Sequence, residues 1–409
     1  MDSANRRILA TLLFSVFATV TGVGIVVPLL PVHAHRLGAD GIGVALVFGA
    51  YALARACFLP VFGRWSDRCG RKTFLTAGLL MYALVSIALA CFDHVAAWIA
   101  IRLLHGIASA MLIPVFQAYA AELAPAGREG RVMGIYGGVV LAGMSVGPYA
   151  GGLISDHFGF RTTFWIMAAL ALAGFAACML LLPSTSNEPS LRAVKTPVTW
   201  RALLRDRELS SLLIFRTAYV VCVGIIWGFV PLHASLVLPI NSASIGLIIT
   251  LGIASGGVLN APMGVLADRV DRRAMVAGGG TLAVFGMLGF ALATSYHDFV
   301  LASVCFGVGG GVCMPALMAL AARKGSGADA MASVMALMTI AHSAGMLVGA
   351  VLGGVAMQLL SLHWVFPIGG FAMAVGTIQY LCVGCEVEVP DSETPPVPHR
   401  LAAGAGSPS

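Results

Sequence analysis

The sequence predicts an all-α membrane protein with twelve transmembrane helices in two pseudo-symmetric six-helix bundles, and three observations predict this fold class. Hydrophobic residues make up 59% of the 409 residues and charged residues only 10%, against about 45–50% and about 25% in soluble domains. Many apolar stretches are long enough to cross a bilayer, and a charged loop recurs at about half the chain length. The stretches lack the alternation of barrel strands, and backbone groups in lipid must bond internally, so helices are expected.

A transmembrane helix needs about 20 apolar residues. In the first half, stretches of that length fall at 8–32, 41–62, 74–92, 96–121, 131–154 and 162–182. In the second half they fall at 210–234, 243–264, 274–295, 299–322, 329–355 and 363–384. The first stretch has no small-residue cleavage site, so we interpret it as a span and not as a removed signal peptide.

These spans divide the chain into four segments. We predict an N-terminal six-helix bundle at 1–182, a cytoplasmic linker at 183–209, a C-terminal six-helix bundle at 210–385 and a disordered cytoplasmic tail at 386–409. The linker interrupts the apolar pattern with prolines and basic residues, and the tail is rich in Pro, Gly and Ser.

The loop charges predict the orientation. One set of loops carries nearly all the Lys and Arg, whereas the other set carries only Arg36 and Arg161. The positive-inside rule therefore places both termini in the cytoplasm, with the chain in the cell (inner) membrane. Since topology explains the net charge of +6, no nucleic-acid partner is expected.

The two halves share a repeated pattern. The loop 63–72 (GRWSDRCGRK) recurs in degraded form at 264–273 (GVLADRVDRR), 201 residues later. The stretches 106–114 (GIASAMLIP) and 307–315 (GVGGGVCMP) have the same spacing. A weaker echo of the loop, 155–161 (SDHFGFR), falls on the opposite membrane face. A nested inverted repeat would produce this placement.

The loop 63–72 resembles the signature between the second and third helices of the major facilitator superfamily. The resemblance covers nearly the whole chain except the linker and tail, and it implies the major facilitator fold. In that family the loop aspartate, here Asp67, latches the cytoplasmic side while the transporter faces outward. We expect a cytoplasmic latch made by both loop copies and by the acid ending the fourth span: Gly63, Asp67, Arg68, Gly70, Arg71, Lys72, Asp268, Arg269, Glu122 and Arg131.

Two details of this latch are expected. Glu122 should pair with Arg128 or Arg131. Gly70 permits a left-handed turn, whereas the second copy has Asp271 in place of that glycine. The latch should therefore depend more on the first copy of the loop than on the second.

The fifth span contains residues 143–152 (GMSVGPYAGG), which resemble the GPxxGG motif of the drug:proton antiporter branch. Glycines at i, i+4 and i+8 lie on one helix face, where a second helix can approach closely, and a proline kinks the helix. The motif residues are Gly143, Gly147, Pro148, Gly151 and Gly152. Ordinary glycine packing is the alternative interpretation, because residues 345, 349 and 353 repeat the glycines without the proline.

The fourth span carries Arg102 followed by His105 and a glycine, which resembles the family motif of a membrane arginine before a Gln-Gly pair. A charge at the bilayer centre costs about 2.5–3.5 kcal/mol, so Arg102 should face the bundle interior. In the family this arginine is linked to proton transfer. Several proton-driven exporters also carry an acid in the first helix, and this chain has none between Arg7 and Asp40. By elimination, we hypothesise that Arg102, His105 and His342 set proton coupling; a polar clamp and packing histidines are the alternatives.

A cavity for a bulky amphiphile is predicted from membrane-embedded polar and aromatic residues. Arg55 would meet either an anionic substrate group or a backbone carbonyl. The predicted cavity residues are Tyr51, Arg55, Phe116, Gln117, Tyr119 and Trp227. For the aromatic members, core packing is the alternative.

The leading hypothesis is a monomeric, proton-coupled secondary transporter that exports small amphiphilic molecules, such as drugs or siderophore-like metabolites, by alternating access. Its partners would be the substrate, protons and the bilayer. The alternatives are a symporter that imports a metabolite and a non-transporting receptor or scaffold on the same fold. The sequence has no nucleophile–base constellation, and its glycine-rich runs lack the Lys-Ser/Thr of phosphate loops. We therefore expect no enzyme, no cofactor and, because the histidines are scattered, no metal site.

Overall fold

The computed structural model describes residues 3–125, 128–183, 203–327 and 330–384. Most of the predicted linker and nearly all of the predicted tail lie outside these ranges. The described residues form twelve helices long and apolar enough to span a membrane, so the predicted fold class is confirmed. The first six are α1 (Ser3–Arg36), α2 (Gly41–Cys69), α3 (Arg71–Cys91), α4 (Val95–Glu122), α5 (Glu129–Phe158) and α6 (Phe160–Leu181).

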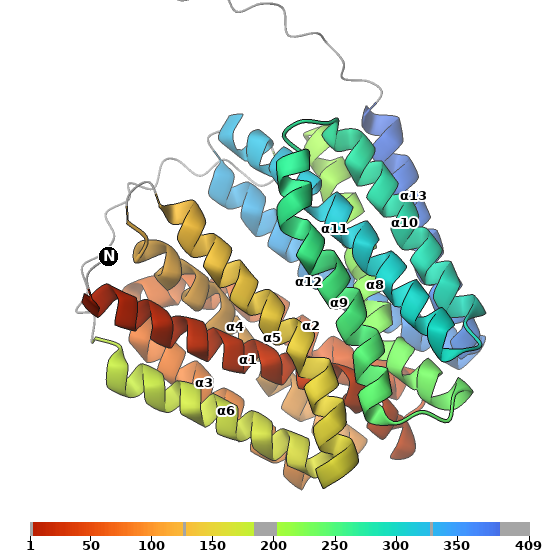
Figure 1. Cartoon of the computed structure of the whole chain (residues 1–409), viewed down its shortest axis with the longest axis horizontal. Coiled ribbons are helices and arrows are strands. Elements are labelled where there is room, and N and C mark those ends of the chain that lie inside the picture. The colour runs from red at the N-terminus through yellow and green to blue at the C-terminus, as the bar shows by residue number, and fades with distance from the viewer. Residues whose placement is uncertain (1–2, 126–127, 184–202, 328–329, 385–409) are drawn as a thin grey trace, which may run out of the picture.

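The second half begins with α8 (Arg207–Val237) and α9 (Ser242–Leu266). It continues with α10 (Arg272–Leu292), α11 (Tyr296–Gly327), α12 (Met331–Leu359), the short 3-10 helix η1 (Leu362–Trp364) and α13 (Val365–Gly384). Figure 1 shows α1–α6 and α8–α13 as two groups of helices that meet at one end.

Side-chain caps begin several helices where the apolar pattern resumes. Asp40 accepts the N–H of Gly43 at the start of α2, at 2.7 Å. Asn241 accepts the N–H of Ser244 at the start of α9, at 2.9 Å. Such caps satisfy amide groups that have no partner inside the helix. The loop residues therefore fix where each helix starts.

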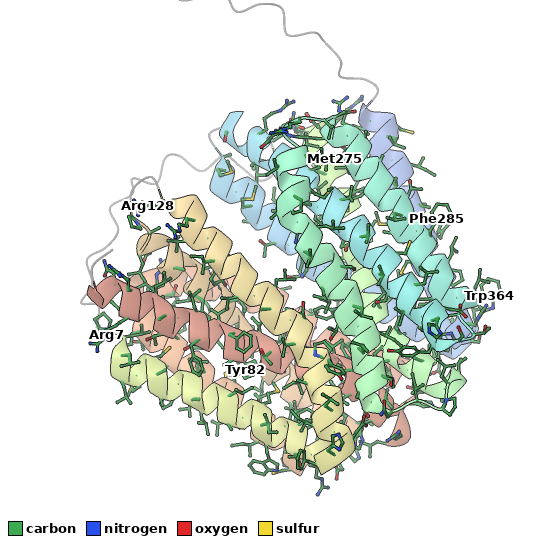
Figure 2. All side chains as sticks on the ribbon, viewed as in Figure 1. Arg7, Tyr82, Arg128, Met275, Phe285 and Trp364 are labelled. Carbon is green, nitrogen blue, oxygen red and sulfur yellow. The ribbon has the colours of Figure 1, made fainter. Side chains whose placement is uncertain are left out.

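The bundle has two ends that differ in charge. We define the basic end by Arg71, Lys72, Arg128, Arg272 and Arg273, and we name the other end the opposite end. Large apolar side chains cover the outer surface, where Phe285 and Trp364 project outward, whereas Tyr82 lies inside the first half (Figure 2). An apolar exterior of this kind suits a protein surrounded by lipid.

The halves are packed in the same way by small residues. Gly143, Gly147 and Gly151 of α5 face α1, because a Cβ added at each would meet backbone atoms of α1. In the second half, α12 faces α8 through glycines at 345 and 349, which meet backbone atoms of α8, and at 353, which meets the ring of Phe229. The predicted correspondence between the two glycine rows is therefore realised in space.

The halves touch closely at the opposite end and diverge toward the basic end (Figure 1). Gly152 of α5 lies against Ser242 of α9, and Gly354 of α12 lies against Gly41 of α2. By contrast, a Cβ added at glycines 130, 134, 137 or 138 of α5 would meet no atom within 4 Å. The structure is thus closed at the opposite end and open at the basic end.

Candidate functional site

A polar cavity of about 290 Å³ lies between the two halves. Its wall combines α2 and α4 of the first half with α8, α11 and α12 of the second. The polar side chains in this wall are Arg55, Gln117, Arg216, Thr339 and His342. Only residues from both halves together complete this wall, so a relative movement of the halves would reshape it.

A second, more apolar cavity of about 360 Å³ adjoins the first. It is formed mainly by α8, α9 and α11, with Leu141 of α5 as its contribution from the first half. Tyr219 and Phe306 stack in its wall with ring centroids 5.0 Å apart, and Trp227 lines the same cavity. Arg216 lines both cavities, so the polar and apolar compartments meet at this side chain.

Arg216 is held by neutral partners. Its Nη1 donates to the sulfur of Met314 at 2.7 Å, and its Nη2 donates to Nδ1 of His342 at 3.3 Å. Its Nε is buried without a hydrogen-bond partner. Because arginine can only donate, His342 must accept at Nδ1 and carry its proton on Nε2. Arg216 and His342 therefore form a hydrogen-bonded pair in the cavity wall, in which Arg216 carries the positive charge and His342 is the acceptor.

Arg55 faces the same polar cavity from α2. Its Nε is buried and unpaired, and no hydrogen bond or ion pair joins it to any residue in the described part of the chain. The sequence allowed two alternative partners for Arg55, a backbone carbonyl or an anionic substrate group. The described residues provide no carbonyl partner, so the guanidinium is left available to the cavity.

Arg102 and His105 form a separate pair inside the first half. The side chains are 4% and 0% exposed, and neither lines the two cavities. Arg102 donates through Nε to the carbonyl of Val47 at 3.1 Å and through Nη1 to Nδ1 of His105 at 2.8 Å. It also lies 4.4 Å from the ring centroid of Tyr51. Arg102 faces the interior as predicted, but the structure separates this pair from His342.

The predicted cavity residues divide into two groups. Arg55, Gln117 and Trp227 lie in cavity walls. The prediction was wrong for Tyr51, Phe116 and Tyr119, which are buried in the core of the first half and line neither cavity. Tyr51 instead bonds Ser109 through its hydroxyl at 2.9 Å.

The helix-5 motif has two contact faces. Gly143, Gly147 and Gly151 share the face toward α1, as their spacing predicts. Gly152 and the carbonyl of Pro148 instead face α9 of the second half. The motif therefore packs one helix within its own half and forms the contact between halves at the opposite end.

The latch residues at the basic end are partly described. Gly70 has a φ of 90° and ends α2, as expected for a glycine-dependent turn. Arg71 then donates to Glu122 at 2.6 Å, and Lys72 donates to the carbonyl of Leu182 at 2.6 Å. The surroundings of Gly63, Asp67 and Arg68 lie outside what the structure describes.

The predicted partner of Glu122 was wrong. Arg128 and Arg131 are exposed at the start of α5, and neither pairs with Glu122. The turn at Gly70 instead places Arg71 next to the end of α4. A local turn conformation that sequence spacing does not specify decides this ion pair.

The second copy of the loop has a different structure. Asp271 has a φ of −60° and caps α10 by accepting the N–H of Arg273 at 2.8 Å. Asp268 pairs with Arg272 at 3.0 Å within the loop, and Arg269 is exposed. Without a glycine, this copy does not form the turn of the first copy.

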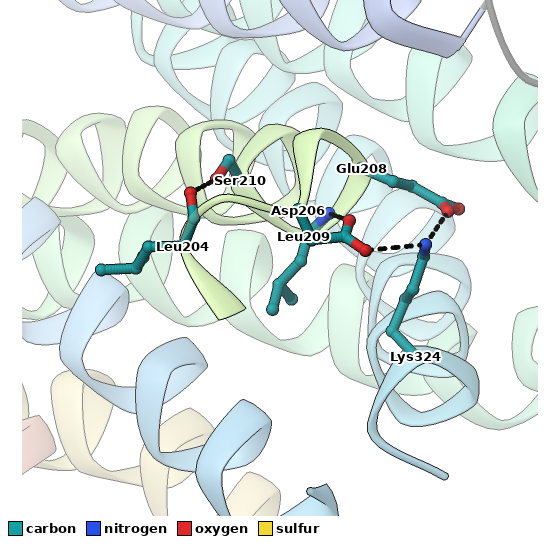
Figure 3. A network of polar contacts seen from close by, with 6 residues as sticks. All are labelled: Leu204, Asp206, Glu208, Leu209, Ser210 and Lys324. Carbon is teal, nitrogen blue, oxygen red and sulfur yellow. Dashed lines mark hydrogen bonds and ion pairs between the residues drawn. The ribbon is translucent and has the colours of Figure 1, made fainter. Parts of the chain in front are cut away.

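A further ion-pair cluster joins α8 and α11 at the basic end (Figure 3). Lys324 contacts Asp206 at 3.2 Å and Glu208 at 2.6 Å. Burial raises the pKa of Asp206, but the bonds from the N–H of Leu209 and from Lys324 outweigh it and leave that pKa below its usual value. Like the Arg71–Glu122 pair, this cluster lies within one half.

Comparison with known proteins identifies the family. The sequence profile of the Major Facilitator Superfamily matches residues 12–241 and 212–405. The chain belongs to the major facilitator superfamily. The twelve helices of its described residues are thus those of a major facilitator transporter.

Two relatives match most of this major facilitator chain. An uncharacterized MFS-type transporter of Methanocaldococcus jannaschii is 28% identical over 377 residues, which cover 89% of this chain and 95% of the relative. Multidrug resistance protein 2 of Bacillus subtilis is 24% identical over 383 residues, covering 91% and 94%. The crystal structure of the nucleoside transporter NupG superimposes with a TM-score of 0.77 at 13% identity, covering 92% and 98%. This last similarity supports the fold alone.

Among the cavity residues of this major facilitator chain that the sequence did not predict, Arg216 lies in the walls of both cavities. It interrupts an apolar stretch (LLIFRTAYVV) in the same way that Arg102 does. A charge inside an apolar span is costly in lipid, so an arginine at such a position is expected to face the protein interior or a cavity. The sequence therefore marks Arg216 as a residue to explain, but it does not show where the side chain points.

Proposed function

We propose that this protein is a proton-coupled secondary transporter that exports small amphiphilic molecules by alternating access. One observation carries the proposal: a cavity whose wall is completed by both halves, beside an apolar compartment lined by Trp227, Tyr219 and Phe306. A site of this composition suits a molecule with one polar group and an apolar body. The similarity to Multidrug resistance protein 2 supports the assignment to drug export.

In this proposal the basic end faces the cytoplasm, following the positive-inside rule. Substrate enters the cavity from that end while Gly152 and its partners close the opposite end. The halves then rock so that the basic end closes and the opposite end opens. The loop 63–72 is proposed to hold the closed basic end, with Asp67 as the main latch residue.

Proton coupling is proposed to involve Arg102, His105 and His342. Among the described residues no carboxylate lines either cavity, and histidine is the side chain that titrates near physiological pH. Of the three, His342 lines the cavity that substrate would occupy. Arg102 and His105 are proposed to act from within the first half, through the α2 backbone that Arg102 contacts.

A susceptibility and accumulation screen in a pump-deficient bacterial host tests export. Cells that produce the wild-type protein should accumulate less of the exported compound than cells without it. The Asp67→Asn variant, produced at the same level, should lose this protection. Equal accumulation with and without the protein across a broad amphiphile panel would favour a non-transporting receptor or scaffold.

Inverted membrane vesicles test the direction and the coupling. An exporter concentrates substrate inside these vesicles when their lumen is acidified, whereas an importing symporter does not. His342→Gln should abolish the response to the proton gradient. His363→Gln is the matched control, because His363 is exposed and lines neither cavity. A full response in the His342→Gln, His105→Gln double variant would contradict coupling through these histidines.

A further inference from the structure

The polar cavity has an unbalanced positive charge. Arg55 and Arg216 both line it, and each has a buried, unpaired Nε. All carboxylates whose side chains are described lie at or near helix ends: Asp40, Asp93, Glu122, Asp156, Asp206, Glu208, Asp268, Asp271 and Asp298. The described chain therefore provides no counter-ion for the two arginines.

Arg102 shows how this protein satisfies a buried arginine that lines neither cavity. It is buried, donates to the Val47 carbonyl and to His105, and stacks on Tyr51. Arg55 has no such partner in the described chain, and Arg216 has only a thioether and a histidine nitrogen. Both arginines line the cavity between the halves, and each keeps a donor without a partner.

From this contrast we infer that the site binds an anionic amphiphile, a carboxylate with an apolar or aromatic body, whose charged group lies between Arg55 and Arg216. The guanidinium group presents several donors in a planar fork that matches a carboxylate. Since Arg216 also lines the apolar cavity, a carboxylate bound there has its body directed toward Tyr219, Trp227 and Phe306. This inference rests on the proposed transport function and adds the chemical class of the substrate.

Neutral polar groups complete the site. Gln117 of α4 and Thr339 of α12 line the same cavity on either side of the boundary between the halves. His342 accepts from Arg216 and so fixes the orientation of that guanidinium. An anion bridging Arg55 of the first half and Arg216 of the second would link the two halves electrostatically.

Binding to the full-length protein in phosphatidylcholine nanodiscs tests this inference without requiring transport. The probes are 1-naphthoate and decanoate, each compared with its amide and with the primary amine of the same carbon skeleton. Thermal shift and isothermal titration should show the carboxylates binding at least tenfold more tightly than the amides and amines. Equal or tighter binding of the amines, or no binding of either carboxylate, would overturn the inference.

Variants locate the binding. Arg216→Gln and Arg55→Gln should each weaken carboxylate binding at least tenfold, and Arg55→Lys should restore part of it because the charge returns. Arg161→Gln is the control, since Arg161 is exposed at the opposite end, where it pairs with Asp93. If the folded Gln variants, checked by gel filtration, keep the carboxylate preference of the wild type, the assigned site is wrong.

Further measurements distinguish this inference from lipid-headgroup binding and from the proposed transport function. Phosphatidylglycerol added to the nanodiscs should leave naphthoate binding within twofold; loss of binding would assign the arginines to a lipid headgroup and overturn the inference. Proton-driven export of a cationic amphiphile, without carboxylate binding, would keep the proposed function and remove the anion site. Carboxylate binding without proton-driven flux would keep the site and remove proton-coupled export.

Discussion

The turns that follow α2 and α5 have the same local geometry at the two ends of the bundle. Gly70 has φ and ψ of 90° and 139°, and Gly159 has 87° and 156°. Each glycine donates its N–H to the carbonyl of a serine four residues earlier, at 3.2 Å for Ser66 and 3.0 Å for Ser155. The weak sequence similarity between 66–71 and 155–161 therefore corresponds to the same turn structure, which occurs at both ends of the bundle in opposite orientations.

The two ends differ in whether the halves are joined. At the opposite end, Asp156 accepts the N–H groups of Ser242 at 3.0 Å and Ala243 at 2.8 Å, across the boundary between the halves. At the basic end, each ion pair between described residues joins two residues of the same half. The comparison teaches that the aspartate of this turn, bound to a helix start in the other half, can hold one end closed. We expect Asp67 to act likewise when the basic end closes.

The largest expected effect comes from preventing the halves from meeting. In Gly152→Val the new side chain would overlap backbone atoms of Ser242 and Ala243, so the closed opposite end should be almost completely lost. Spin labels on exposed Phe158 and Leu236 should report a longer distance between the halves. Uptake of the substrate found in the screen should fall more than tenfold.

The matched control for this prediction is Gly138→Val on the same helix. A Cβ at Gly138 would meet no atom within 4 Å, so the label distance and the uptake should stay near those of the wild type. If Gly152→Val left the label distance unchanged, the closed contact between α5 and α9 would not form in the membrane.

The second effect tests whether the two turns are equivalent. Gly70→Ala and Gly159→Ala should each destabilise the protein by about 1–3 kcal/mol, because only glycine readily adopts this backbone conformation. Thermal unfolding in detergent measures the loss. Gly134→Ala is the control, since Gly134 is helical and has open space around it. Clearly unequal losses for the two turns would contradict their equivalence.

Much of this comparison could be predicted from the sequence. Twelve spans, two repeated halves and the inverted echo all follow from apolar length and matched glycines and charges. Several helices are longer than the predicted spans, as in α2, which continues to Cys69 where 41–62 was expected. The additional helical turns contain polar residues, so a search for apolar stretches does not include them. The helix nevertheless continues through these residues, beyond the apolar core of the bilayer.

The site was less predictable for physical reasons. Phe116 and Tyr119 lie on a helix that is apolar on nearly all sides, so the sequence does not show which face meets a cavity and which meets the core. Arg216 lies six residues into the predicted span 210–234, where an arginine can extend its charge to the membrane surface. Only the tertiary contacts with Met314 and His342 place it in the cavity wall.

A third, smaller effect addresses Asp156 directly. Asp156→Asn removes the negative charge at the start of α9 and leaves one carbonyl oxygen for two N–H groups. The charge at a helix start contributes about 0.3–1 kcal/mol at an exposed site, so the population closed at the opposite end should fall about two- to fivefold relative to the open one. The Phe158–Leu236 label distances measure this shift. Asp93→Asn is the control, because Asp93 lies at the same end and pairs within its own half.

The smallest effect concerns the arginine that follows each turn. Arg71 pairs with Glu122 at the end of α4, and Arg161 pairs with Asp93 just before the start of the same helix. Glu122 is 48% exposed, so Glu122→Gln should cost about 0–1 kcal/mol of stability, and raising the salt concentration should reduce the loss further. Thermal unfolding at low and high salt measures both. A loss for Glu122→Gln as large as that for Gly70→Ala would show that the arginine pair, and not the backbone of the turn, maintains the basic end. The two ends would then differ in the ion pair that follows the turn, and not only in whether Asp156 or Asp67 binds the other half.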